Sequence, residues 1–328
     1  TMTDENHWRV IRLAEFTRPS APATTLLQQW YHHIRNIFIQ ADEASLEEES
    51  ESLPGYRDFS VAPAAQALDE AFADWLSKPT PGVKFLVGPP HSGLASIASV
   101  WAAQRDWSCL TAPDRKQIEE AAIDSWWEPQ AAEQWVIPDF SSYWQRRVNG
   151  LSFIRALLPR ILQGSLGQGL VVCDSWSFIF LQHTSLLHLS HIYCFAAADA
   201  PLLRQLGIRA PTKQLKSLAA QALGNPGVAL ALWTAMREGH HEPPCVPIGS
   251  DDSTAFVLYS LLLHHGLSRD DLQDVLPNLT VTQIDGQLLL LEQAQIVHRE
   301  QQQWQVSVHG YLTARDFLKS RGFDVDAF

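Results

Sequence analysis

Residues 83–104 read VKFLVGPPHSGLASIASVWAAQ, and this stretch decides the fold class. Its first five residues, all apolar except Lys84, are of the kind found in strands. The run leads into a loop bounded by Gly88 and Gly93, and a helix is predicted over 94–104. A strand, a glycine-bounded loop and a helix form the outline of a phosphate-binding loop, in which backbone N–H groups and the helix N-terminus receive phosphate oxygens.

This loop lacks the two side chains that normally follow its second glycine. A Lys there balances the charge of the β- and γ-phosphates, and the next residue, Ser or Thr, binds Mg²⁺. Leu94 and Ala95 occupy these positions, and Ser96 comes one residue late. A plain glycine turn between a strand and a helix is the alternative interpretation. The loop residues that we assign to a vestigial nucleotide site are Gly88, His91, Ser92 and Gly93.

Short apolar strands alternate with helices from residue 83 to residue 206. Such alternation predicts a parallel sheet with helices on both faces. The predicted strands cover residues 83–87, 108–111, 134–138, 170–173 and 191–195, with helices at 94–104, 114–123 and 151–162 between them.

Two aspartates follow predicted strands, Asp139 after the third and Asp174 after the fourth. The end of a buried strand is where P-loop ATPases place the carboxylate that binds Mg²⁺, and in many of them a Glu follows and activates water. Phe140 stands at that next position here, and Asp174 is not followed by Glu either. We prefer Asp139, because the loop then lies on the first strand and the acid on the third. For both residues, an N-cap or turn role remains the alternative.

The region after residue 206 is predicted to be helical. Helices at 212–223 and 228–238 are separated by Gly-Asn-Pro226-Gly, and a Pro in the first turn of a helix is also ordinary capping chemistry. A second helical region begins near residue 251. Its third helix is followed by two short strands, which is the order of elements in a winged helix. The predicted helices are 253–265, a capped helix beginning at Ser268, 281–294 and 310–320, with strands at 296–299 and 305–308.

The order of these motifs resembles the AAA+/STAND class of P-loop ATPases over residues 83–328. By that resemblance Gly88 and Gly93 match the loop glycines, Asp139 matches the metal-binding acid, and Pro226 matches a lid proline that lies against the adenine. The resemblance implies a parallel five-stranded α/β domain, a helical lid and a C-terminal winged helix. The expected domains are an N-terminal helical region with an acidic loop at 1–60, the degenerate P-loop domain at 61–206, the lid and linker at 207–249, and the winged helix at 250–328. Within the first two, helices are predicted over 24–40 and 62–76.

The composition limits the partners that are expected. The 328 residues carry 24 Lys and Arg against 36 Asp and Glu, a net charge of −12, which disfavours general nucleic-acid binding. The third helix of the predicted winged helix contains Asp285 and Glu292 and no Lys or Arg, so we expect it to dock a protein instead of DNA. The Trp126-Trp127 segment and the tail at 322–328 are further candidates for partner contacts. For the tail, a frayed end or a strand that completes the domain are alternatives.

The location and chemistry follow from a few further observations. No signal peptide is visible, no apolar run is long enough to span a membrane, and four dispersed cysteines indicate a reduced, cytoplasmic protein of bacterial type. No metal site is predicted, because no His, Cys and acid cluster has suitable spacing.

The sequence therefore predicts a non-catalytic pseudo-ATPase that acts as a protein-binding scaffold or regulatory subunit of a multiprotein assembly. No cofactor is expected, although weak ATP or ADP binding is compatible with the loop. Two alternatives remain open. One is an atypical nucleotide-binding switch with little hydrolysis, and the other is a winged-helix regulator associated with DNA.

Overall fold

The computed structural model describes residues 6–20, 59–78, 80–184, 189, 191–239 and 243–328. The chain has the predicted α/β fold, a mostly parallel sheet with helices on both faces. The helix predicted at 24–40 and the acidic loop after it lie outside the described residues. Within the described ranges, no helix is long and apolar enough to cross a membrane.

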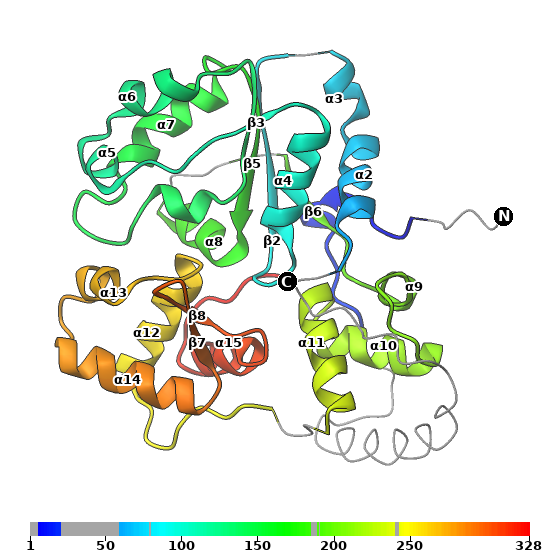
Figure 1. Cartoon of the computed structure of the whole chain (residues 1–328), viewed down its shortest axis with the longest axis vertical. Coiled ribbons are helices and arrows are strands. Elements are labelled where there is room, and N and C mark those ends of the chain that lie inside the picture. Colours follow the sequence, from blue (N-terminus) through cyan, green and yellow to red (C-terminus); the bar gives the residue numbers. More distant parts are fainter. Residues whose placement is uncertain (1–5, 21–58, 79, 185–188, 190, 240–242) are drawn as a thin grey trace.

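The main sheet has six strands in the order β1-β6-β2-β5-β4-β3 (Figure 1). Strands β2 to β6 are parallel, and β2, which leads into the glycine-bounded loop, lies between β5 and β6. Strand β5 lies between β2 and β4, and all three run parallel. The residues that follow these strands therefore meet at the same edge of the sheet. The strands are β1 Val10–Arg12, β2 Gly82–Gly88, β3 Ser108–Cys109, β4 Gln134–Ile137, β5 Gln168–Asp174 and β6 Ile192–Phe195.

For the main sheet the sequence predicted five strands, and the structure adds a sixth, β1. It runs antiparallel to β6, with Val10 opposite Phe195 and Arg12 opposite Tyr193. Three residues carry too little alternation to be recognised as a strand from the sequence. The pairing covers an edge of the parallel sheet that would otherwise be unpaired.

Alternating side chains of β2 divide the interior into two cores. Leu86 packs with the helices α2 and α4 on one face of the sheet. Phe85 and Val87 pack with α5, α6, α7 and α8 on the other face. This is the period of two that a doubly covered strand requires. The helices are α2 Ala62–Ala71, α3 Ala73–Ser77, α4 Leu94–Gln104, α5 Arg115–Glu120, α6 Ile123–Trp127, α7 Ser152–Leu162 and α8 Ser175–His183.

Two predicted helices are each divided by a break, and two helices, Ser175–His183 and Ala200–Gln205, were not predicted. The helix expected at 62–76 breaks at Phe72, which caps both α2 and α3. The helix expected at 114–123 ends at Ala121, whose φ of 52° is left-handed. Helix α8 was not predicted, although Asp174 caps its N-terminus through the N–H of Trp176.

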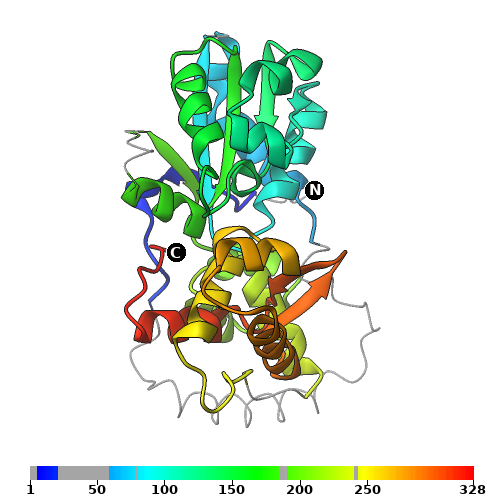
Figure 2. The same cartoon turned by 90° about the vertical axis from the view of Figure 1, so that its left-hand side faces the viewer.

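The remaining helices lie beyond the carboxyl edge of the sheet (Figures 1 and 2). Strands β7 and β8 form the predicted hairpin, joined by Gln301 and Gln302, whose positive φ angles of 46° and 70° suit a two-residue turn. The elements are α9 Ala200–Gln205, α10 Thr212–Gln221, α11 Pro226–Arg237, α12 Asp252–Leu263, α13 Arg269–Val275, α14 Val281–Gln293, β7 Val297–Glu300, β8 Gln303–Val306 and α15 Tyr311–Ser320.

Two of the candidate partner surfaces are packed inside the protein. Trp126 is 4% exposed, stacks edge-on against Tyr143 and Phe153, and donates its indole N–H to the carbonyl of Thr111. The tail is also folded back. Its Asp326 is buried, accepts a hydrogen bond from Ser175 and pairs with the buried Arg315, so the tail is held to the rest of the protein at this residue.

Candidate functional site

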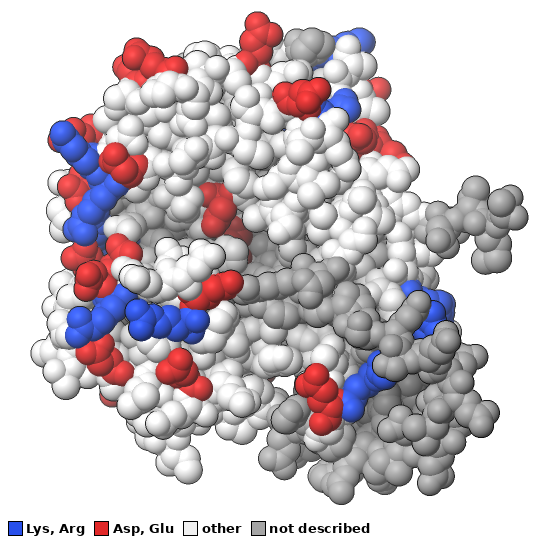
Figure 3. All heavy atoms as spheres, in the orientation of Figure 1, with Lys and Arg blue, Asp and Glu red and all other residues white. Residues whose placement is uncertain are grey.

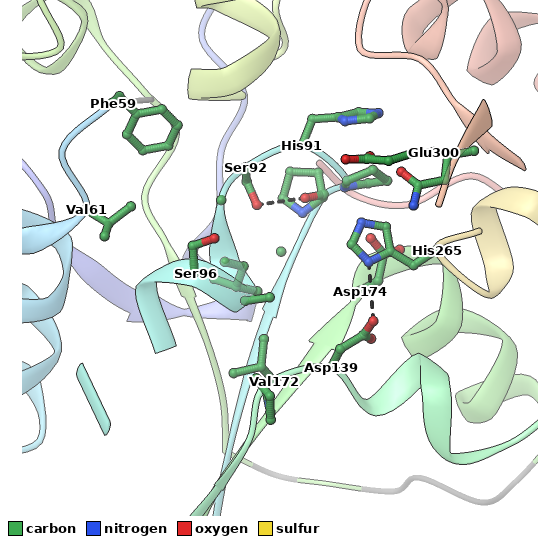
Figure 4. Close-up of a pocket in the computed structure, with 18 of the residues that line it drawn as sticks. Phe59, Val61, His91, Ser92, Ser96, Asp139, Val172, Asp174, His265 and Glu300 are labelled. Atoms are coloured by element: carbon green, nitrogen blue, oxygen red, sulfur yellow. Dashed lines mark hydrogen bonds and ion pairs between the residues drawn. The ribbon is translucent and has the colours of Figure 1, made fainter. Parts of the chain in front are cut away.

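A cavity of about 470 Å³ lies over the glycine-bounded loop, between the carboxyl edge of the sheet and the C-terminal hairpin (Figure 4). Its size falls in the range of small-molecule sites. The sequence-predicted residues that line it are Gly88, His91, Ser92, Gly93, Asp139 and Asp174. Pro226 is the one predicted residue that does not line it.

Hydrogen bonds within the loop and from Asn225, at the start of helix α11, hold the loop in shape. Gly93 has a φ of 76° and begins helix α4, and His91 has a φ of 65°. Ser92 donates both its backbone N–H and its hydroxyl to the carbonyl of Pro89. Asn225 donates its side-chain N–H to the carbonyl of Pro90 at 2.7 Å. The loop therefore has the shape of a strand-to-helix turn.

Helix α11 approaches the loop at its first turn. A Cβ at Gly227 would collide with the carbonyl oxygen of His91, so only glycine permits this approach. Asn225 caps the same helix by accepting from the N–H groups of Gly227 and Val228. The side chain of Asn225 therefore bonds both helix α11 and the loop.

Leu94 fills the place beside Gly88 where a phosphate-binding lysine is expected. Leu94 is 8% exposed, and a Cβ on Gly88 would lie 3.1 Å from its Cδ2. The side chain is packed in the core with Ile97 and Ala98 of the same helix. Neither Leu94 nor Ala95 has a group that binds phosphate or metal.

Asp139 is held by its own strand end and by the C-terminal region. Its Oδ1 accepts from the N–H of Ser141 at 2.9 Å and from the Ser141 hydroxyl at 2.5 Å. Its Oδ2 lies 3.3 Å from Nδ1 of His265. Burial alone would raise the pKa of Asp139, but the His265 and Ser141 bonds and the His265 charge outweigh it, so the pKa lies below its ordinary value.

The residue after Asp139 is buried in the core. Phe140 is 0% exposed and packs against Phe85 and Tyr143. A glutamate at this place would have to point into the cavity to activate water, whereas Phe140 points into the sheet core. No described neighbour of Asp139 supplies such a carboxylate on the same strand end.

Asp174 ends β5 directly beside the loop strand. It lies opposite Gly88 in the register of the sheet and is 9% exposed. Its Oδ1 accepts from the N–H of Trp176, which makes it the N-cap of α8. Burial raises the pKa of Asp174 to about 7, against the opposing effect of the His265 charge. The N-cap role considered for Asp174 is thus present together with a place on the cavity wall.

The C-terminal region closes the cavity, which the sequence did not predict. His265 follows α12 with a left-handed φ of 56°, and Glu300, Gln303 and Gln305 come from the hairpin. His265 and Asp139 are 126 positions apart, so no local pattern could have linked them. Figure 3 shows acidic side chains in the hollow between these two parts of the molecule.

A second, much smaller cavity lies near Pro226, on another side of the loop. It measures about 30 Å³, room for about two water molecules, and is too small for a nucleotide base. Aromatic side chains from both ends of the described chain and from β6 line it: Trp8, Phe16, Phe195 and Phe328. Trp8 and Phe328 are 4% and 5% exposed.

No protein-family model and no curated protein matches the chain. Solved structures do match, among them the Thermotoga maritima RuvB Holliday junction branch migration motor, with 16% identity and a TM-score of 0.34 over 81% of this chain and 94% of that one. A Walker-type ATPase of Pyrococcus abyssi matches with 11% identity and a TM-score of 0.34, over 80% and 98%. The Aeropyrum pernix Orc1 protein in complex with DNA matches with 16% identity and a TM-score of 0.36, over 79% and 92%.

These structures include AAA+ P-loop ATPases, the class that the sequence motifs resemble. All three TM-scores lie below 0.5. The strand order and the loop between β2 and α4 define the fold.

Proposed function

We propose that the protein is a non-catalytic relative of the AAA+ ATPases that serves as a protein-binding scaffold or regulatory subunit. One observation carries this proposal. The carboxylate at the metal-binding position, Asp139, is engaged by His265 and Ser141. Because these partners use both of its oxygens, Mg²⁺ would have to displace the imidazole to bind there.

Three further substitutions, at Leu94, Ala95 and Phe140, also argue against ATP hydrolysis. Phosphoryl transfer depends on the metal and on a lysine that neutralise charge developing on the transferred group. Leu94 and Ala95 cannot do this, and the buried Phe140 cannot activate water. Each missing charge-assisted contact is worth about 1.5–3 kcal/mol, so their combined loss is incompatible with efficient turnover.

The C-terminal region supports a protein partner over DNA. Residues 251–328 contain five basic and eleven acidic residues, a net charge of −6. Helix α14 exposes Leu289 and Leu290, at 54% and 48%, on the element that would enter the groove of DNA in a winged helix. Phosphate contacts need basic side chains at such a surface, whereas apolar ones suit a protein. Salt-sensitive binding of the full chain to duplex DNA would instead favour the alternative of a winged-helix regulator associated with DNA.

Phosphate release from MgATP by the purified full chain tests the proposal. We expect release no faster than in a protein-free blank, and no change in the Asp139→Ala variant. Glu70→Gln, an exposed substitution on α2, is the matched control. Turnover that Glu70→Gln retains and Asp139→Ala loses would contradict the proposal.

The open cavity favours a second candidate, a nucleotide-binding switch with little hydrolysis. About 470 Å³ remains over the loop, and the side chains of the described lining residues do not fill it. The switch predicts that ADP or ATP raises the melting temperature of the full chain. An unchanged melting temperature at millimolar nucleotide would exclude the nucleotide-binding switch, and the scaffold function would remain as the proposal.

A further inference from the structure

We propose that residues 323–328 form a strap that holds the C-terminal helices and hairpin, residues 251–322, closed over the cavity of about 470 Å³, and that release of the strap opens this cavity. The inference goes beyond the proposed function, because it concerns how the cavity is covered and applies with or without a bound nucleotide. Anchors on both parts of the molecule and a glycine hinge carry it.

The strap leaves helix α15 at a glycine. Gly322 has a φ of 80°, a left-handed conformation that glycine adopts without strain, and a Cβ added there would meet no atom within 4 Å. Residues 323–328 form no helix or strand. Figure 2 shows this segment, in red, rising from α15 beside the blue segment that follows β1. The strap therefore crosses from the C-terminal helices to the part of the molecule that contains the sheet, and Gly322 is a point about which it can turn.

Asp326 anchors the strap to the end of a sheet strand. Its side chain is 1% exposed, and its Oδ2 accepts the hydroxyl of Ser175, the residue directly after β5. Its Oδ1 lies 3.4 Å from Nη2 of Arg315 on α15. A buried aspartate depends on such partners, because a charge that is left without them is costly away from water. Asp326 therefore joins β5 to α15 through contacts that solvent screens little.

Arg18 and Phe16 fasten the strap to the segment that follows β1. Nη2 of Arg18 donates to the carbonyl of Asp326 at 2.9 Å and to the carbonyl of Phe328 at 2.6 Å. The ring centroids of Phe328 and Phe16 are 4.6 Å apart, and Phe328 is 5% exposed. Arg315 donates to the same two carbonyls, at 3.0 and 3.2 Å. Two arginines thus hold the strap, one from the N-terminal segment and one from α15.

Two ion pairs elsewhere between the sheet and the C-terminal helices are more exposed. The side chains of Arg115 and Asp274 are 57% and 34% exposed, and those of His265 and Asp139 are 43% and 31% exposed. Such pairs contribute little, because water screens them and ordering the side chains costs entropy. The buried strap is therefore expected to contribute more to closure than these two ion pairs do.

The strap and the cavity meet at the junction of β5 and α8. Asp174, the last residue of β5, lines the cavity, and Ser175, the next residue, holds Asp326. Gln303 and Gln305 line the cavity from the hairpin, which shares a hydrophobic core with α15. Because the strap leaves from α15, release of Asp326 from Ser175 would free the hairpin to move away from the cavity.

Amide hydrogen exchange of the full chain, followed by nuclear magnetic resonance, tests the inference. The backbone N–H of Arg146, which follows β4, donates to Nε2 of His264 at the end of α12, so its protection from exchange reports closure. In Arg18→Gln the strap loses two charge-assisted hydrogen bonds, while Arg315 and Asp326 keep their contact. We expect the Arg146 amide to exchange about tenfold faster than in the unmodified chain, with the exchange of the β5 amides unchanged.

The matched control is Arg9→Gln, which removes an exposed arginine from the same N-terminal segment and should leave the exchange of Arg146 unchanged. A second variant, Ser175→Ala, removes the bond to Asp326 from the sheet side and should also speed the exchange of Arg146. Unchanged exchange of Arg146 in either Arg18→Gln or Ser175→Ala would overturn the inference. Exchange of the β5 amides that rises as much as that of Arg146 would also contradict it, because the variants would then loosen the whole fold.

Discussion

The two cavities beside the glycine-bounded loop differ in how they depart from a nucleotide site. On the side of Asp139 and Asp174, about 470 Å³ remains open, and its wall is acidic. On the side of Pro226, only about 30 Å³ remains, among aromatic side chains. The first region is open and has carboxylates on its wall, whereas the second is almost filled by packed aromatic side chains.

This contrast predicts different consequences of mutation. A packed region contributes to folding stability, so truncating its side chains should be costly. An open region contributes little to stability, so its substitutions should act mainly on binding. Measurements of the free energy of unfolding for variants on both sides of the loop therefore test this contrast.

The largest effect is expected from Trp8→Ala on the packed side. Trp8 is 4% exposed and packs edge-on against Phe195. We expect the free energy of unfolding to fall by about 3–5 kcal/mol, as for other buried aromatic truncations, measured by urea denaturation. Val148→Ala, at a residue that is 85% exposed, should change it by less than about 0.5 kcal/mol. A Trp8→Ala loss below about 1 kcal/mol would show that this side is loosely packed.

An intermediate effect is expected from pH, through the turn that carries His265. The preceding residue, His264, is 7% exposed, and its Nε2 accepts the N–H of Arg146. Burial, with a smaller contribution from the Arg146 charge, lowers the pKa of His264 to about 4. The unfolded chain binds the proton more readily, so stability should be lost as the pH falls from about 6.5 to about 4, by about 1.4 kcal/mol per pH unit.

Urea denaturation at several pH values measures this slope. The His264→Gln variant should remove the contribution, whereas His183→Gln, at an exposed residue, should retain it. An unchanged slope in His264→Gln would show that His264 is not the group responsible.

The smallest effect is expected from the open side. The Asp139 and His265 side chains are 31% and 43% exposed, so solvent screens their interaction. We expect a coupling of less than about 1 kcal/mol in a double-mutant cycle of Asp139→Asn and His265→Gln. A coupling above about 2 kcal/mol would mean that this contact belongs to the folding core, and the contrast between the two sides would fail.

The sequence predicted the parts of the fold that have local signals. Strand β2, the loop and helix α4 follow from alternation, glycine and periodicity within 22 residues. Asp139 and Asp174 could be placed at one edge because parallel strands end together. By contrast, the His265 contact and the aromatic filling around Pro226 join segments far apart in sequence, which no spacing rule reveals. Trp126 was misjudged as a partner surface because composition does not distinguish a buried indole from an exposed one.

Binding of Mn²⁺ in place of Mg²⁺ tests the central claim most directly. Electron paramagnetic resonance reports free Mn²⁺, and ATP alone lowers the signal by a known amount. The account predicts that the full chain causes no further loss, and that Asp139→Asn behaves like the unmodified chain. A further loss of signal that requires both ATP and Asp139 would show that the metal site is intact and would contradict the account.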